Sequence, residues 1–168
     1  MNRTVKAALI TTALVGAVVV PVTTSAASAA APSHTTPGHP VLTDQQRRAI
    51  VGKFATAVVH DDHAGFIAST TSDFVWTIPG HSRISGRTTG RGDLLGLLGT
   101  FDRYQLTISV RALTFGADTV AVEVHDTGSY HGKKLDQDVV NVLTIRDGKV
   151  SSADGNFADV AAFDAYFA

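Results

Sequence analysis

The hydrophobic pattern of this chain changes its period near residue 105, and this change limits the folds open to it. Before that point, apolar residues recur at spacings of three, four and seven, the pattern of one helix face. After it, apolar and polar residues alternate, the pattern of a half-buried strand. Helices followed by a run of strands predict an α+β domain. The helical set comprises Ile50, Val51, Phe54, Ala57 and Val58, and the alternating set includes Leu106, Ile108, Val110, Val120, Val122 and Val124.

Turn signals divide the second half of the chain into strands. Gly116-Ala117-Asp118, His131-Gly132 and Asp147-Gly148 separate four segments, the last of which ends at Phe157. Such short connections favour an antiparallel meander. A further strand is predicted earlier in the chain, from Asp73 to Ile78.

Residues that can cap helices mark three helix starts in the first half. Thr43 or Asp44 precedes the first helix, Asp62 the second and Asp93 the third. A curved antiparallel sheet wrapped around these N-terminal helices is the natural packing, and it gives a cone-shaped barrel with an open mouth. Such a mouth is a usual place for a small-molecule site.

The N-terminus has the three-part layout of a secretory signal peptide. Arg3 and Lys6 precede an apolar stretch from Ala7 to Val20, and small residues follow Pro21. The stretch is shorter than the roughly 20 apolar residues that a transmembrane helix needs. We therefore predict that residues 1–29 are a signal peptide, that the mature protein starts at Ala30, and that it is secreted.

A linker and one domain are predicted after the signal peptide. Residues 30–41 are rich in Pro, Ser, Thr and Ala and show no periodicity, which is typical of a flexible linker. Residues 42–168 form the domain. The chain has no cysteine, so no disulfide can support this domain and its core alone must hold it together.

Composition and motifs exclude several function classes. Loss of Arg3 and Lys6 with the signal leaves twelve basic against fifteen acidic residues, a net charge of about −3 that opposes contact with nucleic acid. His60-Asp61-Asp62-His63 has the residue types of a metal site, but it falls where one predicted helix ends and the next is capped. We expect no metal, no cofactor and no membrane contact after signal cleavage.

Several short motifs carry a family resemblance. Trp76-Thr77-Ile78-Pro79-Gly80, the Gly90 region, the turn at Arg146-Asp147-Gly148 and the terminal Phe163-Asp164-Ala165-Tyr166-Phe167 occur in an order that resembles the SnoaL-like polyketide cyclase family. That family is part of the ketosteroid-isomerase-like and nuclear-transport-factor-like superfamily. The resemblance covers about Leu42 to Ala168. It implies a conical barrel with a deep, mostly apolar pocket, often in a homodimer, but the fold hosts several activities and does not decide the chemistry.

The chain departs from the active ketosteroid isomerases at two positions. The resemblance places their oxyanion-binding tyrosine at Phe54 and their general-base aspartate at Thr77. Phe54 has no hydroxyl, and threonine is a very weak base. Their second oxyanion donor aligns with Asn141, whose amide can still donate a hydrogen bond.

Asp126 is the first candidate catalytic residue. It continues the apolar positions Val120, Val122 and Val124, so strand alternation turns it inward. Desolvation at an apolar wall would raise the pKa of its carboxyl and suit it to general acid–base work. The alternative is a strand that ends at Thr127, which would leave Asp126 at a wet rim.

Asn141 is the second candidate catalytic residue. It lies in line with Val139 and Leu143, so its amide is expected to face the same interior and to need a partner. A ligand, Asp126, a water or a backbone group could supply that partner, and a structural role stays open beside a ligand-binding one. The candidate ligand-binding residues are Phe54, Trp76, Thr77, Val124 and Phe157.

Three functions follow from these patterns. The first is an exported domain that binds a small apolar or polycyclic molecule, with catalysis left open. The second is a cyclase or isomerase that uses Asp126 as its acid–base group. The third is a non-catalytic module for dimerisation or protein binding.

Overall fold

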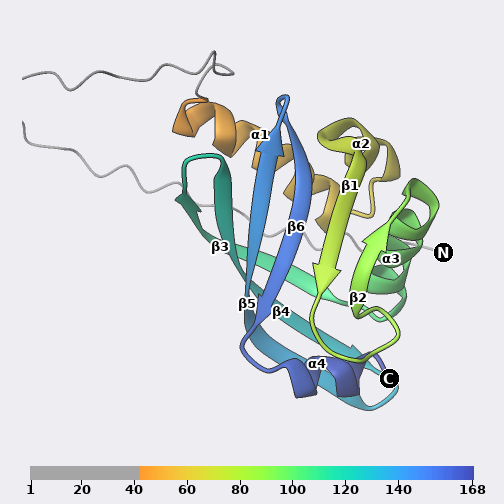
Figure 1. Ribbon diagram of the computed structural model, residues 1–168. Coiled ribbons are helices and arrows are strands. Elements are labelled where there is room, and N and C mark those ends of the chain that lie inside the picture. Colours follow the sequence, from red (N-terminus) through yellow and green to blue (C-terminus); the bar gives the residue numbers. More distant parts are fainter. Residues whose placement is uncertain (1–41) are drawn as a thin grey trace, which may run out of the picture. The chain divides into compact units, whose positions relative to one another are not determined.

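The computed structural model describes residues 42–168, in which most of the helices precede a run of four strands (Figure 1). The predicted signal peptide and linker lie outside the described residues. No helix within residues 42–168 has the length and apolar character needed to cross a membrane. In chain order the elements are α1 (Asp44–Val59), α2 (His63–Ser69), β1 (Thr70–Ile78), β2 (Gly86–Thr89), α3 (Arg91–Arg103), β3 (Thr107–Phe115), β4 (Thr119–Tyr130), β5 (Lys133–Arg146), β6 (Lys149–Phe157) and α4 (Val160–Tyr166).

The six strands form one sheet in the order β2-β1-β6-β5-β4-β3. Strands β3 to β6 are antiparallel neighbours, so the predicted meander is present. The expectation of a wholly antiparallel sheet was wrong, because β1 runs parallel to β6. These two strands are far apart in the chain and share no hairpin, so neither turn residues nor alternation could reveal their relative direction.

Two of the three predicted helix caps are present. The Thr43 side chain accepts a hydrogen bond from the Gln46 backbone N–H at 3.2 Å, and Asp62 accepts one from the Gly65 N–H at 3.0 Å. The third prediction was wrong, because α3 begins two residues before Asp93. Its cap is Gly90, whose φ of 85° is a conformation that glycine adopts without strain.

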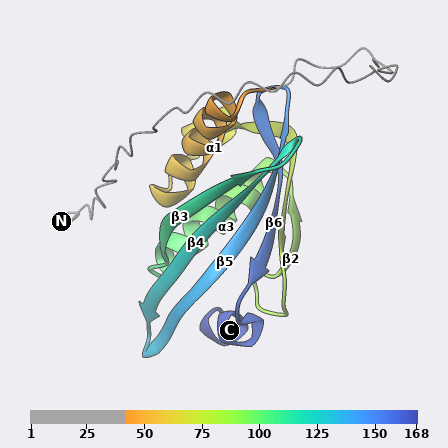
Figure 2. The same ribbon diagram turned by 90° about the vertical axis from the view of Figure 1, so that its left-hand side faces the viewer.

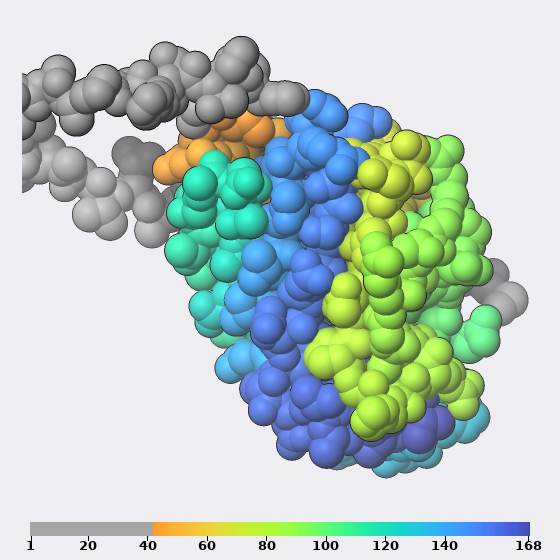
Figure 3. Space-filling model, in the orientation of Figure 1, coloured from red at the N-terminus to blue at the C-terminus, as the bar shows by residue number. Residues whose placement is uncertain are grey.

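The helices α1 and α3 lie on the concave side of the curved sheet, and α4 lies at one end (Figures 1 and 2). The buried side of α1 carries Val51, Phe54 and Ala57, which is the face that the sequence spacing predicted. The opposite face of the sheet is covered by no helix of the described chain (Figure 3). The concave side is therefore the place where side chains from helices and strands can enclose a site.

The loop between β1 and β2 is attached to α4. The Asp164 carboxylate accepts hydrogen bonds from the backbone N–H groups of His81 and Ser82, at 2.8 Å each, and from the Ser85 hydroxyl at 3.1 Å. The Tyr166 hydroxyl donates to the carbonyl of Tyr104, just beyond α3. These bonds fix α4 against the rest of the cone and place Phe163 at the inner wall.

Candidate functional site

Two adjoining cavities lie on the concave side of the sheet. The first has a volume of about 440 Å³, solvent at its mouth included, and lies between α1 and strands β3 to β6. The second, of about 330 Å³ with the open solvent at its mouth also included, lies toward α4 and the end of α3. Trp76, Ile108, Val124 and Asn141 border both. The other residues around the first are Phe54, Ala55, Val58, Val59, Val110, Val122, Leu143 and Ala153, and around the second Ile78, Phe101, Leu106, Asp126, Val139, Phe157 and Phe163.

Small residues in β6 leave room at the first cavity. Ala153 lies opposite Leu143, and Gly155 lies opposite Asn141. A Cβ built on Gly155 would lie 2.9 Å from the Phe157 ring and 3.5 Å from the Asn141 side-chain oxygen. A larger residue at position 155 would therefore displace the Phe157 ring and crowd the Asn141 amide.

Asp126 lies on the wall of the second cavity, as strand alternation predicted. The residue is 5% exposed, and its Oδ1 atom has no hydrogen-bond partner among the described residues. Burial raises the pKa of its carboxyl from the ordinary value of 3.8 to about 7, while the neighbouring charge of His125 acts weakly in the opposite direction. It is the one ionisable side chain among the residues that border either cavity. The alternative of a wet rim does not fit this burial.

Asn141 lies between the two cavities, at the centre of the sheet. It pairs with Val122 of β4 and Gly155 of β6, and its amide makes no hydrogen bond within the described part of the chain. An amide offers two donors and one acceptor at that point. Asp126 and Asn141 therefore place an acid–base group and a hydrogen-bonding group along one apolar wall.

Four of the five candidate ligand-binding residues border a cavity. Phe54 and Trp76 close the first, with ring centroids 5.8 Å apart, Val124 borders both, and Phe157 borders the second. Thr77 borders neither. Adjacent strand residues point to opposite faces, so Trp76 faces the cavities and Thr77 faces away. Thr77 is therefore withdrawn from the candidate set.

Gln137 belongs near the site although the sequence reasoning did not select it. It lies in β5 directly opposite Asp126 and is 6% exposed. Its Oε1 accepts a hydrogen bond from the Asp159 backbone N–H at 3.0 Å, and its Nε2 has no partner among the described residues. The alternation of β5 was the available signal, because Leu135, Gln137 and Val139 share one parity.

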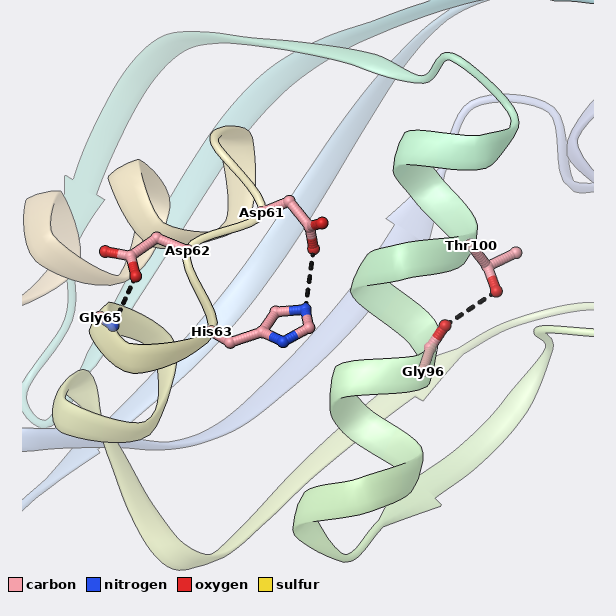
Figure 4. Close-up of polar contacts among 6 residues, drawn as sticks. All are labelled: Asp61, Asp62, His63, Gly65, Gly96 and Thr100. Atoms are coloured by element: carbon pink, nitrogen blue, oxygen red, sulfur yellow. Dashed lines mark hydrogen bonds and ion pairs between the residues drawn. The ribbon is translucent and has the colours of Figure 1, made fainter.

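The His60-Asp61-Asp62-His63 segment forms no metal site. Figure 4 shows the His63 and Asp61 side chains turned toward each other, 3.1 Å apart, while the Asp62 carboxylate caps α2 at Gly65. In α3, on the right of the same view, the Thr100 hydroxyl donates to the Gly96 carbonyl at 2.8 Å. Across residues 42–168, no three His, Cys, Asp or Glu side chains are grouped as metal ligands.

A second polar cluster lies on the outer face of the sheet. The ring nitrogens of His125 contact the carboxylates of Asp138 at 2.7 Å and Asp136 at 3.1 Å. Both carboxylates are largely exposed to solvent. Because His125 and Asp126 are adjacent in a strand, this cluster lies on the opposite side of the sheet from the cavities.

The comparisons with known proteins agree on the family and the fold. A family model described as "SnoaL-like domain" matches residues 51–153. No curated protein matches the sequence. The solved structures with the same fold include NTF2-like proteins, which confirms the predicted cone of helices and curved sheet.

Three solved structures illustrate the match. Bal32a, from a soil-derived mobile gene cassette, is 22% identical with a TM-score of 0.70, over 74% of this chain and 98% of that one. An NTF2-like protein from Burkholderia xenovorans is 25% identical with a TM-score of 0.66, over 75% and 98%. TerC, co-crystallised with polyporic acid, is 22% identical with a TM-score of 0.62, over 73% and 97%.

The buried carboxyl makes stability depend on pH in a definite direction. Since the folded-state pKa of Asp126 lies above its ordinary value, the folded protein binds more protons than the unfolded chain between about pH 4 and about pH 7. Its free energy of unfolding is expected to fall as pH rises through that range, by at most about 4 kcal/mol. Asp126→Asn should lack this step, as measured by urea unfolding across the range.

Asp102→Asn is the matched control for the loss of one negative charge, because Asp102 is exposed on α3. It should keep the pH dependence of the wild type. If the free energy of unfolding depends on pH equally in the wild type and in Asp126→Asn, the pKa of Asp126 is not raised by burial.

Proposed function

The chain belongs to the SnoaL-like family, and we propose that its two cavities bind a small, largely apolar molecule with a ring system. The observation that carries this proposal is the composition of the cavity walls. Besides the indole of Trp76, Asn141 and Asp126 are the polar side chains among the bordering residues. Apolar walls with a few convergent polar groups are typical of small-molecule sites. The co-crystal of TerC with polyporic acid supports the proposal by analogy of fold.

A specific observation favours a second, catalytic function for the same site. Asp126 combines burial, a pKa near 7 and an Oδ1 atom that no group of residues 42–168 pairs with, which suits a residue that takes and returns a proton near neutral pH. In an isomerase or cyclase reaction, Asp126 would remove a proton from a carbon next to a carbonyl. Asn141 would donate a hydrogen bond to the enolate oxygen that forms. Phe54 supplies no hydroxyl to this chemistry, so Asn141 carries the oxyanion role.

The module hypothesis requires a filled cone, which two solvent-connected cavities do not fit. The outer face of the sheet remains uncovered by any described helix and carries the half-exposed Val140. The family resemblance implies a homodimer, and its formation through that face stays a prediction.

Export is part of the proposal. The charged and apolar layout of residues 1–29 supports a cleaved signal peptide, and an exported protein would meet its ligand outside the cytoplasm. Expression of the full chain in a secreting bacterial host should yield a mature protein that starts at Ala30, within about two residues. Mass spectrometry of the culture supernatant and of the cell fraction measures this. An intact Met1 on cell-associated protein would contradict it.

Ligand binding is expected to depend on the rim of the first cavity. Val110 is 46% exposed there, so Val110→Trp can fill the mouth without disturbing the core. With 2-naphthol as probe, binding measured by calorimetry should weaken about tenfold, which corresponds to 1.4 kcal/mol. In wild type, the probe at a hundred times its dissociation constant should raise the free energy of unfolding by about 2.7 kcal/mol.

Val140→Trp is the matched control, because Val140 is 37% exposed but lies on the outer face. It should bind the probe as the wild type does. Equal weakening in both variants, or no binding of any polycyclic probe by the wild type, would count against the cavity as a ligand site.

Catalysis is tested with a β,γ-unsaturated cyclic ketone, whose isomerisation to the conjugated ketone is followed by absorbance. The proton leaves the carbon between the carbonyl and the double bond and returns at the far end of the double bond. Asp126→Asn should lower kcat/KM by about 10²-fold or more. Asp138→Asn, on the outer face, should leave it unchanged. Turnover by Asp126→Asn equal to the wild type would remove Asp126 from the acid–base role.

A further inference from the structure

Asp126 and Gln137 form a buried polar pair that crosses two strands. They are direct partners in the β4–β5 register, and both belong to the inward parity of their strands. Side chains directly opposite each other in an antiparallel pair have Cβ atoms about 4.5–5.5 Å apart. Each of the two residues holds one buried polar atom without a partner among the described residues, Oδ1 in Asp126 and Nε2 in Gln137.

The orientation of the Gln137 amide is set by α4. The Asp159 backbone N–H can only donate, so the atom that it contacts at 3.0 Å must be the Gln137 oxygen. Asp159 is itself held in place as the cap of α4, because its carboxylate accepts from the Ala162 N–H at 2.8 Å. The unpaired atom of Gln137 is therefore a donor, and the unpaired atom of Asp126 directly across from it is an acceptor.

We propose that Gln137 is a positioning residue for Asp126, whose amide N–H donates to Oδ1 and holds the ionised carboxylate in the cavity wall. This proposal deepens the proposed function, since it names the group that keeps the acid–base residue ionised and oriented. A hydrogen bond from a neutral donor to a charged acceptor stabilises the ionised form selectively.

The other charged groups near Asp126 do not take this role. His125 is adjacent in β4, and Asp136 and Asp138 flank Gln137 in β5, but all three belong to the outer face. The Asp159 carboxylate is used in capping α4. The cavity-bordering residues of α1, α3, β1, β3 and β6 carry no charge.

The test is a carbon-13 NMR titration of the Asp126 carboxyl in the ligand-free protein. Gln137→Met keeps the length of the side chain and removes the donor, and it should raise the proton affinity of Asp126 at least tenfold. Gln137→Leu also removes the donor without adding a charge, and it should raise that affinity as well. If one variant fails to fold, the other decides the outcome. A change below twofold in a folded variant would overturn the proposal.

Two further measurements separate this role from a structural one. Gln45→Met, on the exposed side of α1, should leave the titration unchanged. A merely structural Gln137 would alter the thermal stability of its variants but not the titration of Asp126. Because no ligand is needed, a failure of the proposed function appears as absent probe binding or turnover, whereas a failure of this inference appears in the titration.

Discussion

The contact of Phe54 with three other aromatic rings holds the cone together. Its ring centroid lies 5.8 Å from those of Phe66 in α2 and of Phe74 and Trp76 in β1, and all four side chains are buried. Burial of such a side chain contributes about 1.5–3 kcal/mol, and favourable ring pairs add about 0.5–1.5 kcal/mol. Most of the stability of a helix in a protein comes from the packing of its apolar face, so this cluster stabilises α1 and fixes its distance from the sheet. That distance sets the width of the first cavity.

The apolar side chains around the second cavity account for the electrostatics of the site. Asp126 borders that cavity together with Trp76, Phe101, Phe157 and Phe163. Its buried carboxyl is neutral over a wider pH range than one in solution. Two amide side chains lie nearby, Asn141 on the border of the same cavity and Gln137 opposite Asp126 in the β4–β5 register. A largely apolar wall with one carboxyl and amide groups nearby can select among ligands by hydrogen bonding, which an apolar pocket alone cannot do.

Most of the correct predictions about side-chain orientation came from alternation along single strands. It placed Asp126 and Asn141 on the inner wall, and helical spacing selected the buried face of α1. Both patterns depend only on neighbouring residues, so the orientations that they predict stay correct even where the predicted strand order or direction is wrong. The same rule, applied strictly, also excludes Thr77, because Trp76 next to it already faces inward. The rule also predicts that Gln137 faces inward, like Leu135 and Val139. The acidic residues on either side of Gln137 made this part of β5 look polar throughout.

The features that escaped prediction depend on contacts between distant segments. The parallel pairing of β1 with β6 follows from the whole topology, and no residue near either strand encodes its direction. The orientation of the Gln137 amide depends on Asp159, which lies beyond the end of β6. The cap of α3 is a backbone conformation at Gly90 rather than a side-chain bond, so a search for capping side chains selects the wrong residue.

The central position of β6 has a consequence for how the chain reaches its native state. This strand lies between β1 and β5 in the sheet, and its residue Ala153 pairs with Trp76 of β1. It is also the last strand in the chain, so the ribosome synthesises it after all the others. Until β6 is synthesised, the edge of β1 that will pair with it has unpaired backbone N–H and C=O groups. Strands β3 to β5 can already pair with one another as hairpins. Pairings between distant segments slow folding. The last step is therefore expected to be the insertion of β6, and the cavity exists only after it.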